Sequence, residues 1–459
     1  MMNQVEMSAT AMLEYEPVGS IDIEDYEPYV GRERVKELRR LSEPLVGKVW
    51  ANVNSTFVGG GVAEMLRSLV PLARTLGVDA RWYAITGHDS FFHATKTFHN
   101  LLQGLDYQVP LQDIWDLYLE VSNRNASKTL LAADVVEIHD PQPLVSVMNG
   151  TVLGYPLWRC HIDTSSPHRK LWQFMLPYIN RCAGAIFTMP EFVGPGLRLP
   201  LYRIAPSIDP LAAKNRQYTH QEALSVLAPL FHAHNVDPER PILAAVSRYD
   251  VHKNQASILK AFQRLKESHS FKKAPYLIFL GNTATDDPEG GMVLEMLRQQ
   301  AGEDEDVRFW VNVEDNDRVV GALMKLARGF VHVSTREGFG LVVTEALWQG
   351  TPVIGSHAGG IKEQIVDGVT GYLVDPLDLD GIAERMGRLL EHPDETRRLG
   401  ENGREHVRLR FLLPELLRHY LLLIRFYTRA TADPPECSLR GLSPRRLERI
   451  FGRSDSNLA

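Results

Sequence analysis

Cysteine is scarce in this sequence, and the marks of a membrane or secreted protein are missing. The 459 residues include only Cys160, Cys182 and Cys437, too few and too scattered for a disulfide framework or a four-thiolate zinc site. No uninterrupted apolar run approaches the ~18 residues that a membrane helix requires. Residues 1–30 contain no Lys or Arg, whereas a secretory signal begins with basic residues. We therefore expect a protein of a reducing compartment, the cytoplasm.

Basic runs and several familiar motifs are also missing. The formal net charge is -7 and the body of the chain has no long basic run, so neither nucleic acid nor an anionic membrane is expected as a partner. The sequence has no G-x-G-x-x-G fingerprint, Walker sequence, G-x-S-x-G elbow or HExxH pair, which disfavours NAD binding and ATP hydrolysis. Asp286 and Asp287 are adjacent carboxylates, but without a third ligand at useful spacing they predict no metal site.

What the sequence does contain is a repeated alternation of short apolar runs and helical patterns. Such runs are typical of buried parallel strands, and their alternation with helices predicts two doubly wound, Rossmann-like α/β domains. Ligands are then expected in a central cleft at the carboxyl ends of the two sheets. The expected strands are 45–53, 80–85, 135–139, 157–162 and 185–188 in the first half, and 242–247, 276–280, 307–311, 329–333 and 352–355 in the second.

Changes in composition suggest where these domains begin and end. Charged and turn-forming residues dominate near 206–217, where we place the boundary between the domains. We expect an acidic N-terminal lead at 1–40 and Rossmann-like domains at 41–215 and 216–410. A helix at 411–430 should pack back on the N-terminal domain, and the Pro-, Ser- and Arg-rich residues 431–459 should form a flexible tail or, as the alternative, a late docking helix.

The segment 334–350 (STREGFGLVVTEALWQG) is the richest in candidate chemistry. A strand should end before a glycine-flanked loop that carries Glu337, and a helix should begin near Leu341. Glycines let backbone N–H groups approach a ligand, and a helix start attracts anions, so we expect a diphosphate there. Glu345 supplies a second carboxylate suited to sugar hydroxyls. The alternative is that Glu345 only stabilises its helix and Glu337 is a solvated loop residue.

Two other loops follow expected strands of the second half. In 247–254 (SRYDVHKN), Arg248 and Lys253 come from one strand-to-helix turn and could both hold a diphosphate. Alone, such a pair is more often a surface feature, but its position after a core strand favours binding. The Gly-Gly loop in 356–363 (SHAGGIKE) is weak evidence, because many such loops are only tight turns.

Three polar segments of the first half should also lie at the carboxyl ends of strands. Gly59, Gly60 and Gly61 precede the first helix of that half and could meet a phosphate or a sugar. The segments 139–143 (HDPQP) and 161–163 (HID) each follow a short strand. A lone histidine is more often a structural hydrogen-bonding group, but two polar clusters at equivalent strand ends favour a sugar pocket.

Taken together, these residues resemble the retaining glycosyltransferases of the GT-B fold, over most of residues 45–427. The most specific signs are Arg248 with Lys253, and the pattern E-G-F-G-L-x-x-x-E that contains Glu337 and Glu345. Segments of the first half narrow the resemblance to the trehalose-forming branch, the trehalose synthases. These segments are 54–83 (NSTFVGGGVAEMLRSLVPLARTLGVDARWY), 139–143, 160–167 (CHIDTSSP) and 206–215 (PSIDPLAAKN).

The resemblance implies a role for each matching residue. The second domain would bind the nucleotide sugar, with Arg248 and Lys253 on the diphosphate, Glu345 on the ribose and Glu337 on the donor glucose. The remaining donor-side residues are Gly338, Phe339, Gly340 and Leu341 around Glu337, Gly60 and Gly61 in a loop that closes over the diphosphate, and His161 beside the glucose. The first domain would bind the acceptor through Asp140, Gln142 and Asp163.

The resemblance also implies the reaction. A nucleoside diphosphate glucose would donate glucose to a second glucose, reversibly and with retention at the anomeric carbon, to give trehalose. No prosthetic group is implied, and a metal would be unnecessary or only accessory. The donor base and the oligomeric state stay open, a homodimer being one option. The alternatives are a trehalose phosphorylase and a sugar-nucleotide sensor without catalytic activity.

Overall fold

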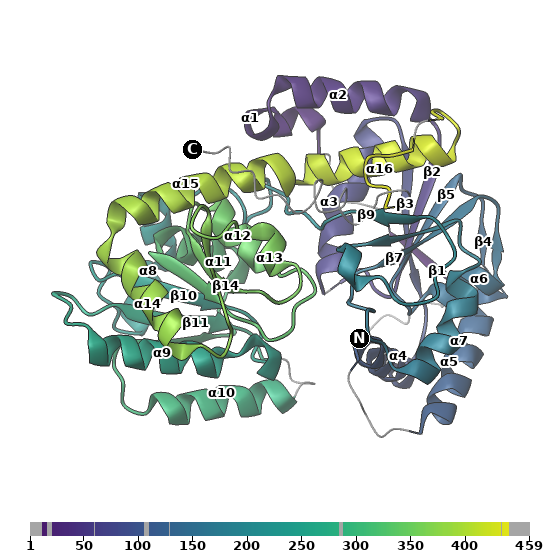
Figure 1. Cartoon of the computed structure of the whole chain (residues 1–459). Coiled ribbons are helices and arrows are strands. Elements are labelled where there is room, and N and C mark those ends of the chain that lie inside the picture. Colours follow the sequence, from purple (N-terminus) through teal and green to yellow (C-terminus); the bar gives the residue numbers. More distant parts are fainter. Residues whose placement is uncertain are drawn as a thin grey trace, which may run out of the picture. The chain divides into compact units, whose positions relative to one another are not determined.

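The computed structural model describes residues 12–15, 21–58, 60–104, 110–127, 129–283, 288–432 and 434–439. The chain divides into two compact units, unit 1 from Met1–Pro206 with Leu413–Ala459 and unit 2 from Ser207–Leu412 (Figure 1). The chain therefore passes from unit 1 to unit 2 after Pro206, before the boundary that the sequence suggested after residue 215. The reason is that the connecting segment packs on unit 2, where the Trp348 indole Nε1 donates to the Asn215 carbonyl oxygen at 2.7 Å. Gly59 and the pair Asp286–Asp287 lie outside the described residues.

Unit 1 is built on a seven-stranded sheet with the order β1-β3-β2-β5-β7-β8-β9. Only β1 is antiparallel to its neighbour; the other pairings are parallel. The chain adds β3 on one side of β2 and then β5 on the other, so the order reverses between β2 and β5. The strands are β1 Met12–Tyr15, β2 Val49–Asn54, β3 Asp79–Ile85, β5 Val135–His139, β7 Tyr155–Cys160, β8 Gly184–Phe187 and β9 Leu201–Arg203, with the separate pair β4 Leu130–Leu131 and β6 Thr151–Val152.

Helices cover both faces of this sheet because successive side chains of its strands point to opposite faces. Trp50 and Val135 enter the cluster formed with α2, α3 and α16, and their neighbours Ala51 and Val136 enter the cluster formed with α4 to α7. The helices of unit 1 are α1 Glu27–Val30, α2 Arg32–Ser42, α3 Gly60–Thr75, α4 Asp89–Leu102, α5 Leu111–Ala126, α6 Leu144–Asn149, α7 Arg169–Ile179 and α16 Leu413–Tyr427, with short 3-10 turns at Ile23–Tyr26, Glu43–Leu45 and Pro190–Phe192.

The two chain ends contribute more to unit 1 than the sequence suggested. The acidic lead expected at 1–40 contains most of α2, which packs with α16 because its apolar side chains, such as Leu38, are buried in the same cluster. Arg418 of α16 forms ion pairs with Glu37 of α2 at 2.7 Å and with Glu436 at 2.9 Å. The lead is therefore a structural part of unit 1 in its described portion.

The described end of the tail expected at 431–459 contacts the sheet of unit 1. The Arg203 N–H donates to the Cys437 carbonyl at 2.8 Å and the Leu439 N–H donates to the Leu201 carbonyl at 2.8 Å. Residues 437–439 thus pair antiparallel with the edge strand β9, whose backbone groups would otherwise lack partners on that side. Residues 440–459 lie outside the described part of the chain.

Unit 2 has six parallel strands in the order β12-β11-β10-β13-β14-β15. This is the doubly wound Rossmann order, which reverses between β10 and β13. Its strands are β10 Ile242–Val246, β11 Tyr276–Gly281, β12 Val307–Val311, β13 Gly329–His332, β14 Val353–Ser356 and β15 Gly371–Val374. Its helices are α8 His220–Ala233, α9 Gln255–Ser268, α10 Pro288–Ala301, α11 Asn316–Leu326, α12 Leu341–Trp348, α13 Ile361–Gln364, α14 Leu379–Glu391 and α15 Pro393–Arg410, with a 3-10 turn at Val251–Lys253.

The predicted fold class is confirmed: each unit is a doubly wound α/β sheet. The ten expected strands are all present, with shifted ends where the apolar run extends past the paired residues. The described part of the chain has five further strands that were not predicted, namely β1, β4, β6, β9 and β15. Among the described residues, no helix is both long enough and apolar enough to span a membrane.

Candidate functional site

The turn after β10 carries Arg248 and Lys253, and its backbone is fixed to the turn after β13. Asn254 ends this turn with a left-handed φ of 56°, a conformation that asparagine tolerates better than most residues. Its Nδ2 donates to the carbonyls of Val333 at 3.1 Å and Pro376 at 2.7 Å. The Thr335 N–H donates to the His252 carbonyl at 2.8 Å. Loops after two strands that are neighbours at the reversal of the sheet are thereby held together.

This contact brings Lys253 and Glu337 into an ion pair. Lys253 Nζ lies 2.7 Å from Glu337 Oε2, and His332 Nε2 lies 2.9 Å from the same oxygen. Burial alone raises the pKa of the Glu337 carboxyl, but the His332 hydrogen bond and the Lys253 charge outweigh it and lower the pKa to about 2. Glu337 is therefore an ionised carboxylate held in place by its partners, a group that can only accept hydrogen bonds.

Glycines allow a second loop to support the loop of Glu337. Gly359 has φ +50°, and a Cβ placed there would lie 1.7 Å from the Glu337 carbonyl oxygen. A Cβ on Gly360 would lie 2.5 Å from the Phe339 side chain. Instead, the Gly360 N–H donates to the Gly338 carbonyl at 3.0 Å. The Gly-Gly loop that seemed weak evidence in the sequence is thus the close packing partner of the E-G-F-G loop.

Helix α12 begins directly after this loop, at the predicted residue. Gly340 is its N-cap, with φ +79°, and Leu341 is its first residue. Glu345 is buried in α12, and its Oε1 lies 2.8 Å from Lys214 Nζ. The sequence prediction did not include Lys214, although it belongs to the quoted segment 206–215.

Arg248 and Lys253 differ in their exposure to solvent and in their ion-pair partners. The Arg248 side chain is 69% exposed, and its Nη2 lies 3.7 Å from the Asp250 carboxylate. The Lys253 side chain is only 19% exposed. The two cations do come from one turn after β10, but within unit 2 only Lys253 is engaged by Glu337.

In unit 1, a polar cluster lies where β5 and β7 end. His139 Nδ1 and His161 Nε2 are 3.0 Å apart, and the His161 N–H donates to Asp140 Oδ1 at 2.9 Å. Asp140 has a left-handed φ of 62°, which orients this buried carboxylate toward the end of β7, and burial raises its pKa. Gln142 is half-buried two residues after Asp140. The structure therefore brings together His139, His161 and Asp140.

The other predicted residues of unit 1 occupy more exposed positions. Gly60 and Gly61 are exposed in the first turn of α3, after β2, and Gly60 has φ +76°. Asp163 is half-buried, and its Oδ1 accepts from the Ser165 N–H at 2.9 Å. Because β2 and β5 flank the reversal of this sheet, Gly60 and Asp140 follow the two strands where doubly wound sheets usually bind ligands.

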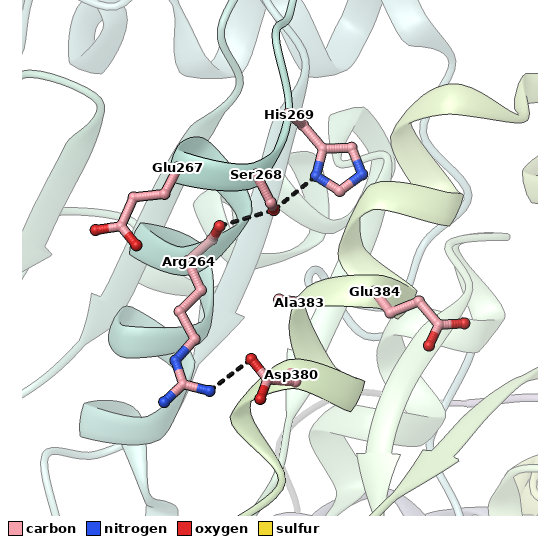
Figure 2. Close-up of a pocket in the computed structure, with 7 residues that line it drawn as sticks. All are labelled: Arg264, Glu267, Ser268, His269, Asp380, Ala383 and Glu384. Carbon is pink, nitrogen blue, oxygen red and sulfur yellow. Dashed lines mark hydrogen bonds and ion pairs between the residues drawn. The ribbon is translucent and has the colours of Figure 1, made fainter.

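A separate surface groove lies between α9 and α14 (Figure 2). It has a volume of about 530 Å³, and Arg264 Nη1 meets Asp380 Oδ1 there at 2.5 Å. Figure 2 shows these two charges facing one another. None of the residues predicted for the site lines this groove, which is formed by Arg264, Glu267, Ser268, His269, Asp380, Ala383 and Glu384. Among the described residues, no cluster of three or more His, Cys, Asp or Glu is arranged to hold a metal ion.

Comparison with known proteins identifies the family. The family model described as the trehalose synthase N-terminal domain matches residues 52–194, and the model described as glycosyl transferases group 1 matches residues 229–406. A trehalose synthase of Pyrococcus horikoshii is 40% identical over 408 residues, which cover 88% of this chain and 96% of that protein. The chain belongs to the trehalose synthase family.

More distant similarities agree with this assignment. A trehalose phosphorylase of Grifola frondosa is 26% identical over 84% of this chain and 58% of its own length. A UDP-forming trehalose-phosphate synthase from Burkholderia xenovorans superposes with a TM-score of 0.66, covering 83% of this chain and 99% of that one, at 16% identity. This trehalose synthase family member therefore has the GT-B fold expected from its sequence.

Four residues of the two clusters were not predicted from the sequence of this family member, namely Lys214, His332, Ser334, whose hydroxyl lies 3.4 Å from Glu337 Oε2, and Asn52, whose Oδ1 lies 3.2 Å from His139 Nε2. Asn52 and His332 lie within strands and look like interruptions of apolar runs, and Lys214 lies in the connecting segment. A polar residue in a strand that is otherwise buried is the one signal that could have pointed to Asn52 and His332.

Proposed function

We propose that this chain is a retaining glucosyltransferase that forms trehalose from a nucleoside diphosphate glucose and glucose, reversibly. The observation that carries the proposal is the convergence of Lys253, His332 and Ser334 on Glu337 Oε2, beside the start of α12. The distances to that oxygen are 2.7, 2.9 and 3.4 Å. Such an arrangement in a trehalose synthase family member suits a sugar whose leaving group is a diphosphate.

In this proposal, unit 2 binds the donor. Lys253 and Arg248 contact the diphosphate and stabilise the charge that develops on the departing nucleotide. The N–H groups of Gly338, Phe339, Gly340 and Leu341 surround Glu337 at a helix start, which favours anions. Glu337 accepts hydrogen bonds from the glucose hydroxyls, and Glu345, held by Lys214, accepts them from the ribose.

Unit 1 supplies the remaining groups. Asp140, Gln142 and Asp163 bind the acceptor glucose, Gly60 and Gly61 approach the donor diphosphate, and His161 contacts the donor glucose. The acceptor hydroxyl attacks from the face that the nucleotide leaves, through an oxocarbenium-like state, which gives retention. No step requires a prosthetic group or a metal. The three free and buried cysteines suit a reducing compartment, and we propose the cytoplasm.

A donor and acceptor screen tests the proposal. The purified full chain is incubated with UDP-, ADP- or GDP-glucose and glucose, and the products are analysed for a non-reducing disaccharide and its anomeric configuration by NMR. We expect α,α-trehalose with at least one donor, and a loss of product in Glu337→Gln. Transfer to other acceptors while glucose stays unmodified would contradict the acceptor assignment.

The trehalose phosphorylase of Grifola frondosa, similar over 84% of this chain, supplies the alternative. A phosphorylase would convert trehalose and inorganic phosphate into glucose and a glucose phosphate without any nucleotide. The same preparation is therefore incubated with trehalose and phosphate alone. Turnover in that assay, with none from the nucleotide sugars, would favour the phosphorylase over our proposal.

A further inference from the structure

Three side chains of unit 1 form a hydrogen-bonded row that ends at His161. Asn52 Oδ1 lies 3.2 Å from His139 Nε2, and His139 Nδ1 lies 3.0 Å from His161 Nε2. Asn52 and His139 lie on the sheet face covered by α16, since they alternate with Val53 and Ile138, which pack on the other face. The row is therefore built into two neighbouring strands, β2 and β5.

The surroundings of His139 decide which of its ring nitrogens carries hydrogen. Its Nε2 faces two acceptors, Asn52 Oδ1 at 3.2 Å and Glu137 Oε1 at 3.9 Å. The amide nitrogen of Asn52 is directed instead to the Arg81 carbonyl, at 3.4 Å. His139 Nε2 must therefore be the donor. Burial, followed by the charge of Arg159, lowers the pKa of His139 to about 3, so the ring is neutral and its Nδ1 has no hydrogen.

The hydrogen position on His139 then determines that on His161. An Nδ1 without hydrogen can only accept, so His161 Nε2 must donate to it. Burial, with the charge of Arg159 next and the His139 and His99 rings after it, lowers the pKa of His161 well below its usual value. A neutral His161 with hydrogen on Nε2 has an Nδ1 that can only accept a hydrogen bond.

We propose that His139, oriented by Asn52, is a positioning residue that holds His161 in the Nε2–H form, so that His161 offers Nδ1 as an acceptor to a sugar hydroxyl. This inference rests on the proposed function, because the sugar is the ligand named there. In this inference His161 recognises an uncharged sugar hydroxyl, which donates a hydrogen bond to His161 Nδ1. It excludes His161 as the acid that protonates the departing phosphate, because a neutral ring that donates from Nε2 to His139 has no second hydrogen to give.

The hydrogen positions can be measured without any substrate. In the full chain labelled with 15N-histidine, two-bond 15N–1H correlations distinguish the Nε2–H and Nδ1–H forms, and His161→Gln identifies the His161 signals among the sixteen histidines. We expect the neutral Nε2–H form at His161. Replacing Asn52 by Leu removes the nearer acceptor of His139 Nε2 and leaves only Glu137 Oε1 at 3.9 Å, and we expect the Nδ1–H form to appear at both rings.

Two substitutions at His139 separate positioning from folding. His139→Leu removes the acceptor, whereas His139→Asn retains an oxygen close to the place of Nδ1. We expect kcat/KM for trehalose formation to fall at least tenfold in His139→Leu and to stay within about threefold of the parent in His139→Asn. Ser146→Ala, a change at another buried polar residue of unit 1, should alter neither the NMR signals nor the activity. Circular dichroism confirms that each variant is folded.

The outcomes distinguish this inference from the proposed function. The Nδ1–H form at His161 in the parent protein, or an unchanged Nε2–H form in Asn52→Leu and His139→Leu, would overturn the positioning role. The expected hydrogen positions in a protein that makes no trehalose from any donor would leave the positioning intact and contradict the proposed function. Equal activity of folded His139→Leu and the parent would show that His161 needs no positioning.

Discussion

Lys253 Nζ and Glu337 Oε2 lie 2.7 Å apart, although 84 residues separate them in the sequence. The contact exists because β10 and β13 are neighbours where the strand order of unit 2 reverses, so the loops that follow them meet. Both side chains are largely buried, at 19% and 11% exposure. An ion pair this buried affects folding as well as ligand binding, which the variants below separate.

The pH dependence of stability should reveal the Glu337 carboxylate. Its pKa falls from 4.5 to about 2 in the folded protein, so the group stabilises the fold above pH 4.5, and this contribution is lost as the pH falls from 4.5 toward 2. The shift corresponds to about 3 kcal/mol. Urea unfolding should show a difference between the parent and Glu337→Gln that is constant above about pH 5 and shrinks below it. Glu384→Gln, at an exposed position of α14, is the control, and a shrinking difference there too would contradict the assignment.

Arg248→Ala and Lys253→Ala should differ in their effect on folding. Lys253→Ala leaves the buried Glu337 without its cation and should cost about 3 to 5 kcal/mol of unfolding free energy. Arg248→Ala, at an exposed side chain, should change it by no more than about 0.5 kcal/mol while lowering kcat/KM about 10- to 100-fold. Arg318→Ala, another exposed arginine, should change neither quantity. If Arg248→Ala kept full activity, Arg248 would not contact the donor.

The contrast between exposed Arg248 and largely buried Lys253 shows how much of the site the sequence could predict. The loops that contain Arg248, Lys253 and Glu337 were found because each follows an apolar run and carries glycine or charge. The sequence also suggested that both cations have the same role. Only the structure shows that one is buried against a carboxylate and the other is exposed, since burial depends on loops that are distant in sequence.

The fold was easier to predict from the sequence than the site, for a physical reason. Central strands such as β10 and β11 are buried on both faces, so they appear as continuous apolar runs. The missed strand β9 has only three residues, too few for a pattern. The pairing of the tail with β9 was also missed, because amino-acid composition does not indicate which residues pair with an edge strand.

The close packing of the Gly-Gly loop on the Glu337 loop gives a further prediction. Gly359→Ala must displace the Glu337 carbonyl and adopts an unfavourable φ, so we expect a loss of about 1 to 2 kcal/mol or more. Because the displaced loop carries Glu337, kcat/KM should fall at least tenfold. Gly291→Ala is the matched control, since its Cβ meets nothing within 4 Å and alanine favours the helix α10. Thermal unfolding and initial rates measure both effects, and full activity in Gly359→Ala would show that this packing is dispensable.

Lys214 and Glu345 should act on donor binding as a unit. Their 2.8 Å ion pair is largely buried, with 15% and 5% of the side chains exposed, so either single change leaves a buried charge without its partner. We expect Lys214→Met and Glu345→Gln each to weaken binding of the donor nucleotide, and the double variant to lose less than the sum, with a coupling of about 0.5 to 3 kcal/mol. Calorimetric titration of UDP, ADP and GDP into the four proteins measures this coupling, and unfolding free energies of the same set give the structural part. If the pair is only structural, coupling appears in the unfolding free energies while nucleotide affinity is unchanged in the folded variants. That result would remove Glu345 from the donor site and leave Lys253 and Glu337 as its buried residues.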